Sequence, residues 1–222
     1  GATGSIGSSL AKNLVNSGDE VHLVGRNEAS LSSLANELNS SFTTCDMLEE
    51  NFTDKILSDL GKTPVNGLAY CVGSIDLKPL KLIKKSDFMQ SFNLNLVSAA
   101  EIIKALADNL KQNKGSIVLF STVAVKQGFP NHAIVSSAKG AVEGLTLALA
   151  AEFAPNIRVN CIAPSLTKSK ISEFILKNEK MAESIAKMKK LLSEKKQIMI
   201  ERCRRVGLEY RSKERIIKID ER

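Results

Sequence analysis

A single lysine stands out in the most constrained stretch of the chain. Residues Asn131–Ala151, NHAIVSSAKGAVEGLTLALAA, predict a helix from Ile134 onward whose side chains are nearly all small or apolar. Lys139 is the one cation in its first turns, and Glu143 is the one acid within four residues of it. Two explanations fit this pattern. Lys139 extends its amine to water from a core or dimer surface, or it faces a cleft and binds a ligand.

A glycine-rich turn supplies a second candidate site. Residues Gly1–Gly7, GATGSIG, run directly into a predicted helix whose core stripe is Ile6, Leu10 and Leu14. Glycines let the backbone approach a pyrophosphate, and a helix N-terminus offers free N–H groups and a positive dipole end. The turn indicates a nucleotide-phosphate site if a strand precedes it, and that strand would lie before residue 1.

An arginine follows the next predicted strand, Glu20–Gly25. Dinucleotide-binding folds place at this point the residue that reads the adenosine ribose, and an acid there favours NAD. This chain has Arg26 instead, which suits a 2′-phosphate and therefore NADP. The alternative is an arginine in a surface turn.

Helices and strands alternate around these candidates. Further helices are predicted at Glu28–Leu38, Phe52–Leu60 and Lys85–Leu110, and further strands at Ser41–Cys45, Gly67–Val72, Ser116–Thr122 and Asn156–Ala163. This order predicts right-handed βαβ units and a parallel sheet, so the fold class is α/β.

Composition fits one domain with a sizeable core. The chain has 222 residues and is 43% hydrophobic. No apolar run approaches the length of a membrane span, and no signal peptide is visible. The four cysteines are scattered, with only His22 and His132 to help them. We therefore expect reduced thiols in a cytosolic protein and no metal site.

The net charge of +7 belongs to the C-terminal tail. Lys187–Arg222 carries 13 lysines and arginines against 6 acids, and the other 186 residues carry 18 of each sign. Charge therefore argues against nucleic-acid binding by the body of the chain. Lys187–Arg205 predicts a basic amphipathic helix, which we expect to be solvated. Contact with nucleic acid or an anionic membrane is the alternative. Ile216–Asp220 is a weak candidate for a last strand.

The segments around Thr122, Lys139 and Pro164 resemble the short-chain dehydrogenase/reductase family. The resemblance covers roughly Gly1 to Met188, and its most specific pieces are GATGSIG, SIVLFSTVA and AKGAVEGLTLALAAEFAPNIRVNCIAPS. It implies a doubly wound parallel sheet with helices on both faces (a Rossmann fold), with the first strand missing and the C-terminal end atypical. Residues 189–222 would form a basic, helical extension.

The resemblance also implies a function. We expect an oxidoreductase that uses NADP rather than NAD on a small carbonyl or alcohol substrate. It would be a cytoplasmic homodimer or homotetramer without a nucleic-acid or membrane partner. The family's substrate loop follows Pro164, and Leu166–Leu176 mixes apolar side chains with lysines. This composition suits an apolar substrate with an acidic end.

Carried over by position, the resemblance assigns the site residues. The implied cofactor-binding residues are Gly1, Thr3, Ser5, Ile6, Gly7, Arg26, Asp46, Met47, Gly73, Asn95, Lys139, Pro164 and Thr167. Asp46 matches the acid that contacts adenine, and Asn95 the asparagine that holds a water in the proton relay. Thr122 replaces the serine that orients the substrate. Lys139 matches the lysine that binds the nicotinamide ribose.

Three departures affect the cofactor site. Ser5 stands where the compact members of the family have the middle glycine of the loop. Tyr70-Cys71-Val72-Gly73 replaces the family's Asn-Asn-Ala-Gly, and Pro164-Ser165 replaces Pro-Gly.

A fourth departure affects the reaction. Four residues before Lys139 the family carries the tyrosine that donates a proton to the carbonyl, and this chain has Val135. Another group could supply the proton, and His132, Tyr70 and Lys139 are the candidates. The alternative for His132 is a loop histidine that faces solvent.

Two further hypotheses remain for the site without its tyrosine. Water held by Asn95, Thr122 and Lys139 could act as a slower acid. Alternatively, the protein binds NADP without chemistry, as a sensor or assembly partner. We favour an oxidoreductase with altered or reduced proton-donor chemistry, for which the catalytic candidates are Asn95, Thr122, Lys139 and His132. A truncated or frameshifted gene product would also explain both unusual ends, and it predicts exposed sheet edges and poor solubility.

Overall fold

The computed structural model describes residues 1–165 and the strand at 216–219, and the two ranges belong to one compact unit. Its strands are β1 (His22–Gly25), β2 (Ser41–Thr44), β3 (Gly67–Tyr70), β4 (Ser116–Phe120), β5 (Arg158–Pro164) and β6 (Ile216–Ile219). Its α-helices are α1 (Ser5–Asn16), α2 (Glu28–Leu38), α3 (Phe52–Leu60), α4 (Lys85–Phe92), α5 (Ser98–Gln112), α6 (Ala124–Gln127) and α7 (Ala133–Glu152). A 3₁₀ turn, η1 (Leu80–Leu82), and a π-helical turn, η2 (Asn93–Val97), complete the described elements.

All the described strand pairs are parallel, which confirms the predicted α/β class. β1 pairs with β2 in one sheet, and β3, β4, β5 and β6 follow in order in the other. The weak strand candidate at the C-terminal end is real, since Ile216 pairs with Cys161 of β5. Part of the predicted helical extension 189–222 is therefore a strand of the main sheet. The predicted helix Lys187–Arg205 lies outside the described residues.

The glycine-rich turn lies between the two sheets. The nitrogens of Gly1 and Ala2 both donate to the carbonyl oxygen of Val24 in β1, at 2.8 and 2.9 Å. On the other side, a Cβ added to Gly1 would lie 2.5 Å from the carbonyl carbon of Cys71, which follows β3. Only glycine fits this approach. The turn is thereby fixed at the carboxyl ends of both β1 and β3.

Helix α1 differs from the prediction. Ile6 and Leu14, predicted as core residues, are each 36% exposed, and the buried residues of α1 are Gly7 and Ala11. The stripe is therefore only partly covered in the described part of the chain, where α1 packs mainly through Ala11. Helical periodicity identified the stripe but not whether another element covers it.

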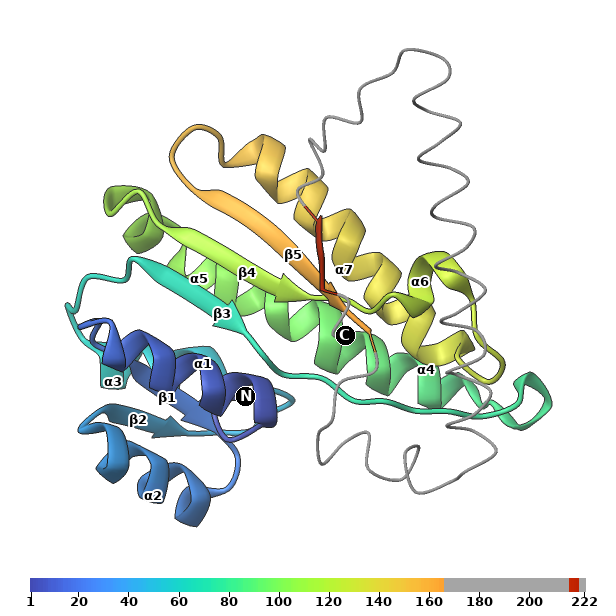
Figure 1. The fold of residues 1–222 in the computed structure, drawn as a ribbon, viewed down its shortest axis with the longest axis horizontal. Helices are drawn as coiled ribbons and strands as arrows, with labels where there is room; N and C mark the ends of the chain where they lie inside the picture. Colours follow the sequence, from blue (N-terminus) through green and yellow to red (C-terminus); the bar gives the residue numbers. More distant parts are fainter. Residues whose placement is uncertain (166–215, 220–222) are drawn as a thin grey trace. The chain divides into compact units, whose positions relative to one another are not determined.

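Two apolar cores support the sheets. The larger core joins α3, α5 and α7 to β3, β4 and β5, and the smaller one joins α1 and α2 to β1. Figure 1 shows α5 and α7 running alongside β4 and β5. Ile103, Leu110, Ile117 and Leu119 are almost completely buried in the larger core. Each such side chain contributes about 1.5–3 kcal/mol of burial free energy.

Helix α7 requires a correction on membrane spans. It has 20 residues and is apolar enough to cross a bilayer by length and composition, contrary to the prediction that no such run exists. Its buried side chains pack on the sheet, however, and include Ile134, Ala138 and Val142. A core helix passes the same composition test. The apolar character of α7 therefore reflects packing on β4 and β5.

The long helix predicted at Lys85–Leu110 is interrupted. α4 and α5 are separated by the π-helical turn η2, and Asn95 lies in this turn with only 1% of its surface exposed. Its side-chain Nδ2 donates to the carbonyl oxygen of Ser91 at 2.9 Å. A side chain that bonds to nearby backbone competes with regular helix formation. Single π turns of this kind are frequent at functional sites.

Candidate active site

Lys139 is a buried amine on α7. Only 9% of the residue is exposed, and its Nζ has no hydrogen bond or ion pair to a described residue. Burial lowers the pKa of the amine from 10.5 to about 8, and the nearby thiols of Cys161 and Cys71 oppose this shift. The amine does not extend to a surface. The cleft explanation of the sequence pattern is therefore the one that the geometry supports.

Asn95 directs an unpaired oxygen toward the same place. Its Oδ1 is buried and has no hydrogen-bond partner among the described residues. Gly73, three residues after β3, lies against both groups. A Cβ at Gly73 would be 2.9 Å from Asn95 Oδ1 and 3.0 Å from Lys139 Nζ. We call these three residues the Gly73 niche. Buried polar atoms without partners are costly, and a ligand or water that bonded to them would relieve the cost.

Two other predicted catalytic residues lie apart from these contacts. Thr122 follows β4 by two residues, is half-buried, and accepts a long 3.3 Å bond from the N–H of Ala124. His132 precedes α7. Its Nδ1 is 2.8 Å from the carbonyl oxygen of Pro130, and its ring packs on Phe129 with centroids 5.2 Å apart. In the described part of the chain, His132 makes no hydrogen bond to the niche, so the loop alternative describes this residue better.

Tyr70 is wrong as a proton donor. Its ring is in the larger core, and its hydroxyl donates to the carbonyl oxygen of Leu94 at 2.7 Å. Burial raises the pKa of this phenol far above its ordinary value. Val135, at the position of the family's tyrosine, is 4% exposed and carries no proton. Lys139 is thus the titratable group that the structure places at the niche.

The glycine-rich turn fits a pyrophosphate. Helix α1 has Gly4 as its N-cap with no side-chain cap, and its first turn contains no acid. The first helical bond runs from Ser8 N to Gly4 O, so the N–H groups of Ser5, Ile6 and Gly7 have no helical acceptor. A Cβ at Gly7 would lie 2.2 Å from the Gly1 carbonyl oxygen, which fixes the close turn. Ser5 and Ile6 are both exposed, so their N–H groups at the start of α1 are offered on the surface of the turn.

The predicted adenosine end is exposed. Arg26 follows β1, and its Nη1 lies 3.5 Å from Oδ2 of Asp46, while Oδ1 of Asp46 accepts from the N–H of Leu48 at 3.0 Å. The Arg26 side chain is 69% exposed and can therefore turn to a phosphate. Thr3 lies beside this end, with Oγ1 3.7 Å from a Cβ placed on Gly25.

Met47 follows β2 and is buried. Its side chain packs in the larger core, and its carbonyl oxygen accepts from Ser98 Oγ at 2.7 Å. The side chain therefore supports the fold, and a contact between the backbone of Met47 and a cofactor stays a prediction. Pro164 ends β5, and its carbonyl oxygen accepts from Val123 N at 3.1 Å. Thr167 lies outside the described residues.

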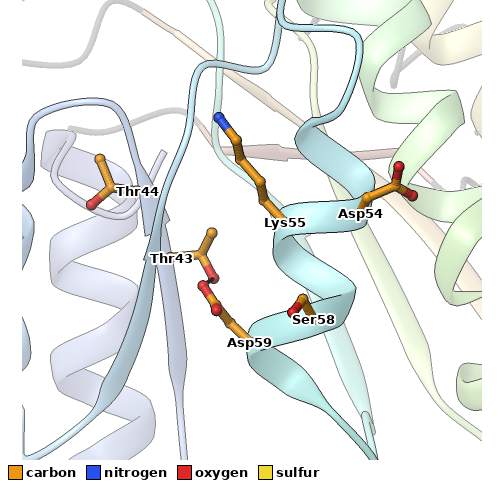
Figure 2. A pocket seen from close by; sticks show the side chains of 6 residues that line it. All are labelled: Thr43, Thr44, Asp54, Lys55, Ser58 and Asp59. Atoms are coloured by element: carbon orange, nitrogen blue, oxygen red, sulfur yellow. Dashed lines mark hydrogen bonds between the residues drawn. The ribbon is translucent and has the colours of Figure 1, made fainter.

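A polar hollow elsewhere in the fold contains none of these residues. Figure 2 shows its lining of Thr43, Thr44, Asp54, Lys55, Ser58 and Asp59, from β2 and α3. Thr43 Oγ1 donates to Asp59 Oδ2 at 2.6 Å, and Lys55 pairs with Glu49 at 2.6 Å. Thr44 Oγ1 in this lining is buried and has no hydrogen-bond partner among the described residues. In the described part of the chain, no cluster of histidine, cysteine or acidic side chains could hold a metal.

Comparison with known proteins identifies relatives along most of the chain. A family model described as enoyl-(acyl carrier protein) reductase matches residues 1–202. The chain is 30% identical to L-xylulose reductase of Bos taurus over 189 residues, which are 83% of this chain and 77% of that one. It is also 30% identical to the 3-oxoacyl-(acyl-carrier-protein) reductase of Rickettsia felis, with the same two coverages.

Solved structures show the same fold. A short-chain dehydrogenase/reductase of the glucose/ribitol dehydrogenase type from Brucella melitensis matches with a TM-score of 0.76 and 25% identity over 80% of this chain and 74% of that one. A short-chain type dehydrogenase/reductase from Mycobacterium ulcerans matches in fold with a TM-score of 0.76 and 23% identity, over 82% of this chain and 71% of that one. The named relatives are reductases and dehydrogenases, and the protein is a nicotinamide-dependent oxidoreductase. The chain belongs to the short-chain dehydrogenase/reductase family.

Proposed function

We propose that the protein binds NADP and interconverts a small carbonyl compound and its alcohol. The Gly73 niche carries this proposal, because it holds a buried amine and an unpaired amide oxygen on either side of one glycine. The α1 amides suit the pyrophosphate. Arg26, free to leave Asp46, suits a 2′-phosphate.

The proton source is the second part of the proposal. The bound cofactor would supply or accept the hydride, and the protein must supply the proton. Lys139 has a pKa of about 8 because it is buried, so its ammonium can release a proton near neutral pH. A water bonded to Asn95 Oδ1 would carry this proton to the substrate oxygen. Lys139 would also hold the ribose, as its counterpart does in the family.

A non-catalytic role is the second candidate, and one observation favours it. Val135 is buried where the family has its tyrosine, so α7 itself offers no phenol at that position. A protein with an intact cofactor site and no efficient acid would serve as a sensor of NADP or as an assembly partner.

The deciding experiment compares wild type with Val135→Tyr and Val135→Phe. NADPH and NADH binding is measured by fluorescence, and reduction is tested on L-xylulose and an acetoacetyl thioester, which represent the substrates in the names of the two relatives above. We expect wild type to bind NADPH more tightly than NADH and to reduce at least one compound slowly. Val135→Tyr should raise this rate, whereas Val135→Phe adds the ring without the hydroxyl and should not.

The outcomes separate the candidate functions. NADPH binding without turnover in wild type, together with turnover in Val135→Tyr, would establish the non-catalytic role and an intact pocket. Failure to bind either nucleotide would overturn both candidates.

We also propose a homo-oligomer that pairs through α5 and α7. Exposed large apolar side chains in this region include Leu147 on α7 and Val97, the last residue of the turn η2 before α5. Light scattering on the eluting protein tests this proposal. A monomer at micromolar concentration would overturn it.

A further inference from the structure

Helix α7 carries a polar row on the side that packs against the sheet. Lys139, Glu143 and Thr146 are spaced by four and three residues, which places them on one helical face. Each is buried to the level of core residues, with at most 9% exposed. Their neighbours on the buried side are Ala138, Val142 and Ala150, which are small or apolar. The row is therefore a polar seam within an apolar interface.

Glu143 has a specific partner across this interface. Its Oε1 accepts a hydrogen bond from Ser121 Oγ at 2.6 Å, and both residues are buried. A hydroxyl-to-carboxylate bond of this length is typical of an ionised acceptor. No ion pair to Glu143 occurs among the described residues. Burying such a carboxylate costs free energy, so the pair is poorly explained by stability alone.

Ser121 connects this bond to the active site. It follows β4 directly and precedes Thr122, and its own N–H donates to the Ile162 carbonyl oxygen in β5 at 2.7 Å. Its Oγ also approaches the carbonyl oxygen of Lys139 at 3.4 Å. The hydroxyl thus touches the helical turn that carries the lysine and the turn that follows it.

Apolar packing alone does not fix how far a helix slides along a sheet, since the hydrophobic effect is non-directional. A single buried polar contact can set such a register, as it does in coiled coils. On α7 the only charged residues are Lys139, Glu143 and the exposed Glu152. The bond from Ser121 Oγ to Glu143 Oε1, together with the longer approach of the same hydroxyl to the Lys139 carbonyl oxygen, ties the centre of this helix to the end of β4.

We propose that Ser121 and Glu143 are positioning residues, whose hydrogen bond holds α7 in the register that places Lys139 Nζ opposite Asn95 Oδ1. This inference rests on the proposed function where it gives Lys139 a catalytic role. The geometry of the hydrogen bond does not depend on that function. A displacement of about 1 Å at a reacting group can cost roughly 100-fold in rate. The pair would therefore affect catalysis without touching substrate or cofactor.

The test compares Glu143→Ala, Glu143→Gln and Ser121→Ala with two controls on the same helix. Thr146→Val removes a buried hydroxyl that bonds to the Val142 carbonyl oxygen within α7 and to the Cys161 side chain in β5, so it disturbs polar contacts of α7 other than the bond between Ser121 and Glu143. Glu152→Ala removes an exposed acid. Lys139 is probed directly by its acetylation rate with acetic anhydride between pH 6 and 11, followed on the peptide by mass spectrometry. This measurement needs neither cofactor nor substrate.

We expect Glu143→Ala and Ser121→Ala to shift the titration midpoint of the Lys139 acetylation rate toward the ordinary lysine value, because a displaced amine gains water. Both should lower kcat about 10- to 100-fold with a smaller change in KM for NADPH. Glu143→Gln keeps an acceptor oxygen and should restore most of both properties. The double variant should resemble either single variant.

Three results would overturn the positioning role. One is an unchanged Lys139 midpoint and kcat in Ser121→Ala. Another is a thermal destabilisation of Glu143→Ala with no more effect on Lys139 than Thr146→Val has. The third is no difference between Glu143→Gln and Glu143→Ala. If Glu143→Ala does not fold, Ser121→Ala, which loses one oxygen atom, decides the question. Failure of wild type to bind NADPH would remove the proposed function, while the acetylation experiment would still test the pair.

Discussion

The molecule places its two candidate ligand-binding cations in opposite environments. Arg26, after β1, is 69% exposed and lies 3.5 Å from Asp46, whereas Lys139, on α7, is 9% exposed and has no partner in the described part of the chain. An exposed pair of this kind is worth about 0–1 kcal/mol and is screened by salt. Burial of Lys139 instead lowers its pKa by more than two pH units. Arg26 is available to recognise a ligand at little cost in stability, whereas the pKa of Lys139 is lowered at a considerable cost in stability.

Burial of the Lys139 amine makes the stability of the fold depend on pH in a definite direction. The pKa of Lys139 is about 8 in the folded protein and near 10.5 in the unfolded chain, so the unfolded chain binds protons more readily. The fold therefore bears the full cost of the charged amine below pH 8, and stability rises as pH increases from 8 to 10.5. At 1.36 kcal/mol per pH unit the cost is about 3 kcal/mol. Exposed Arg26 carries no comparable penalty.

The largest predicted effect comes from removing the buried cation. Lys139→Met keeps the length of the side chain and removes its charge. We expect reduction to fall by about 10²–10⁴-fold, since the proton source is lost. We also expect the free energy of unfolding at pH 7 to increase, by at most about 3 kcal/mol, because a costly charge is gone. Steady-state kinetics and urea denaturation measure the two effects. Reduced stability at pH 7 would contradict the assignment of Lys139 as a strained group.

The second prediction concerns a substitution at Gly73 that fills the space between the Asn95 oxygen and the Lys139 amine. Gly73→Ala would place a methyl group 2.9 Å from Asn95 Oδ1 and 3.0 Å from Lys139 Nζ. Displacement of both should lower kcat about 100-fold. Gly144→Ala is the matched control, because a Cβ there meets nothing within 4 Å. It should leave kcat unchanged and stabilise α7 by up to about 1 kcal/mol. Equal kinetics for the two variants would show that Gly73 is not at the reacting centre.

The third prediction contrasts the pH dependence of the reduction rate, which Lys139 would set, with that of the NADPH affinity, to which Arg26 would contribute. With Lys139 as the proton source, kcat/KM for reduction should be flat below pH 8 and then fall about tenfold per pH unit, as the ammonium of pKa about 8 deprotonates. Arg26 stays charged throughout this range, so the NADPH affinity that it contributes should not follow the same curve. A rate that stays constant to pH 10 would exclude Lys139 as the donor.

The bounds of helices were predicted correctly where the capping residue and the apolar periodicity indicate the same start and end. α2 and α3 have the predicted bounds, Glu28–Leu38 and Phe52–Leu60, and the side chain of Asn27 caps α2 by accepting from Ser30 N. The π turn at η2 was not predicted, because one extra residue per turn hardly disturbs the apolar spacing of α4 and α5. The exposure of Ile6 was not predicted either, since burial depends on which element covers a stripe.

Single residues of the site could be predicted from the sequence, but the contacts between residues distant in the chain could not. Lys139 was identified because a lone cation stands out in an apolar helix, and Asn95 because the family resemblance assigns it. The bond from Ser121 to Glu143 joins residues 22 positions apart, and no local period encodes such a contact. Tyr70 was misassigned as a proton donor for the same reason. A phenol suited the chemistry, but the fold directs its ring into the core.

The smallest predicted effect concerns the exposed end and tests whether Arg26 is more than a surface residue. Arg26→Gln should weaken NADPH binding about tenfold, or about 1.4 kcal/mol, and leave NADH binding unchanged, because only a 2′-phosphate can draw the guanidinium away from Asp46. Added salt should reduce this difference, since the group is solvated. Lys12→Gln, which removes an exposed lysine paired with Glu37 at 2.6 Å, is the charge-matched control. An equal loss for both nucleotides would mean that Arg26 supports the turn after β1 rather than reading the phosphate. Cofactor choice would then have to come from another part of the chain.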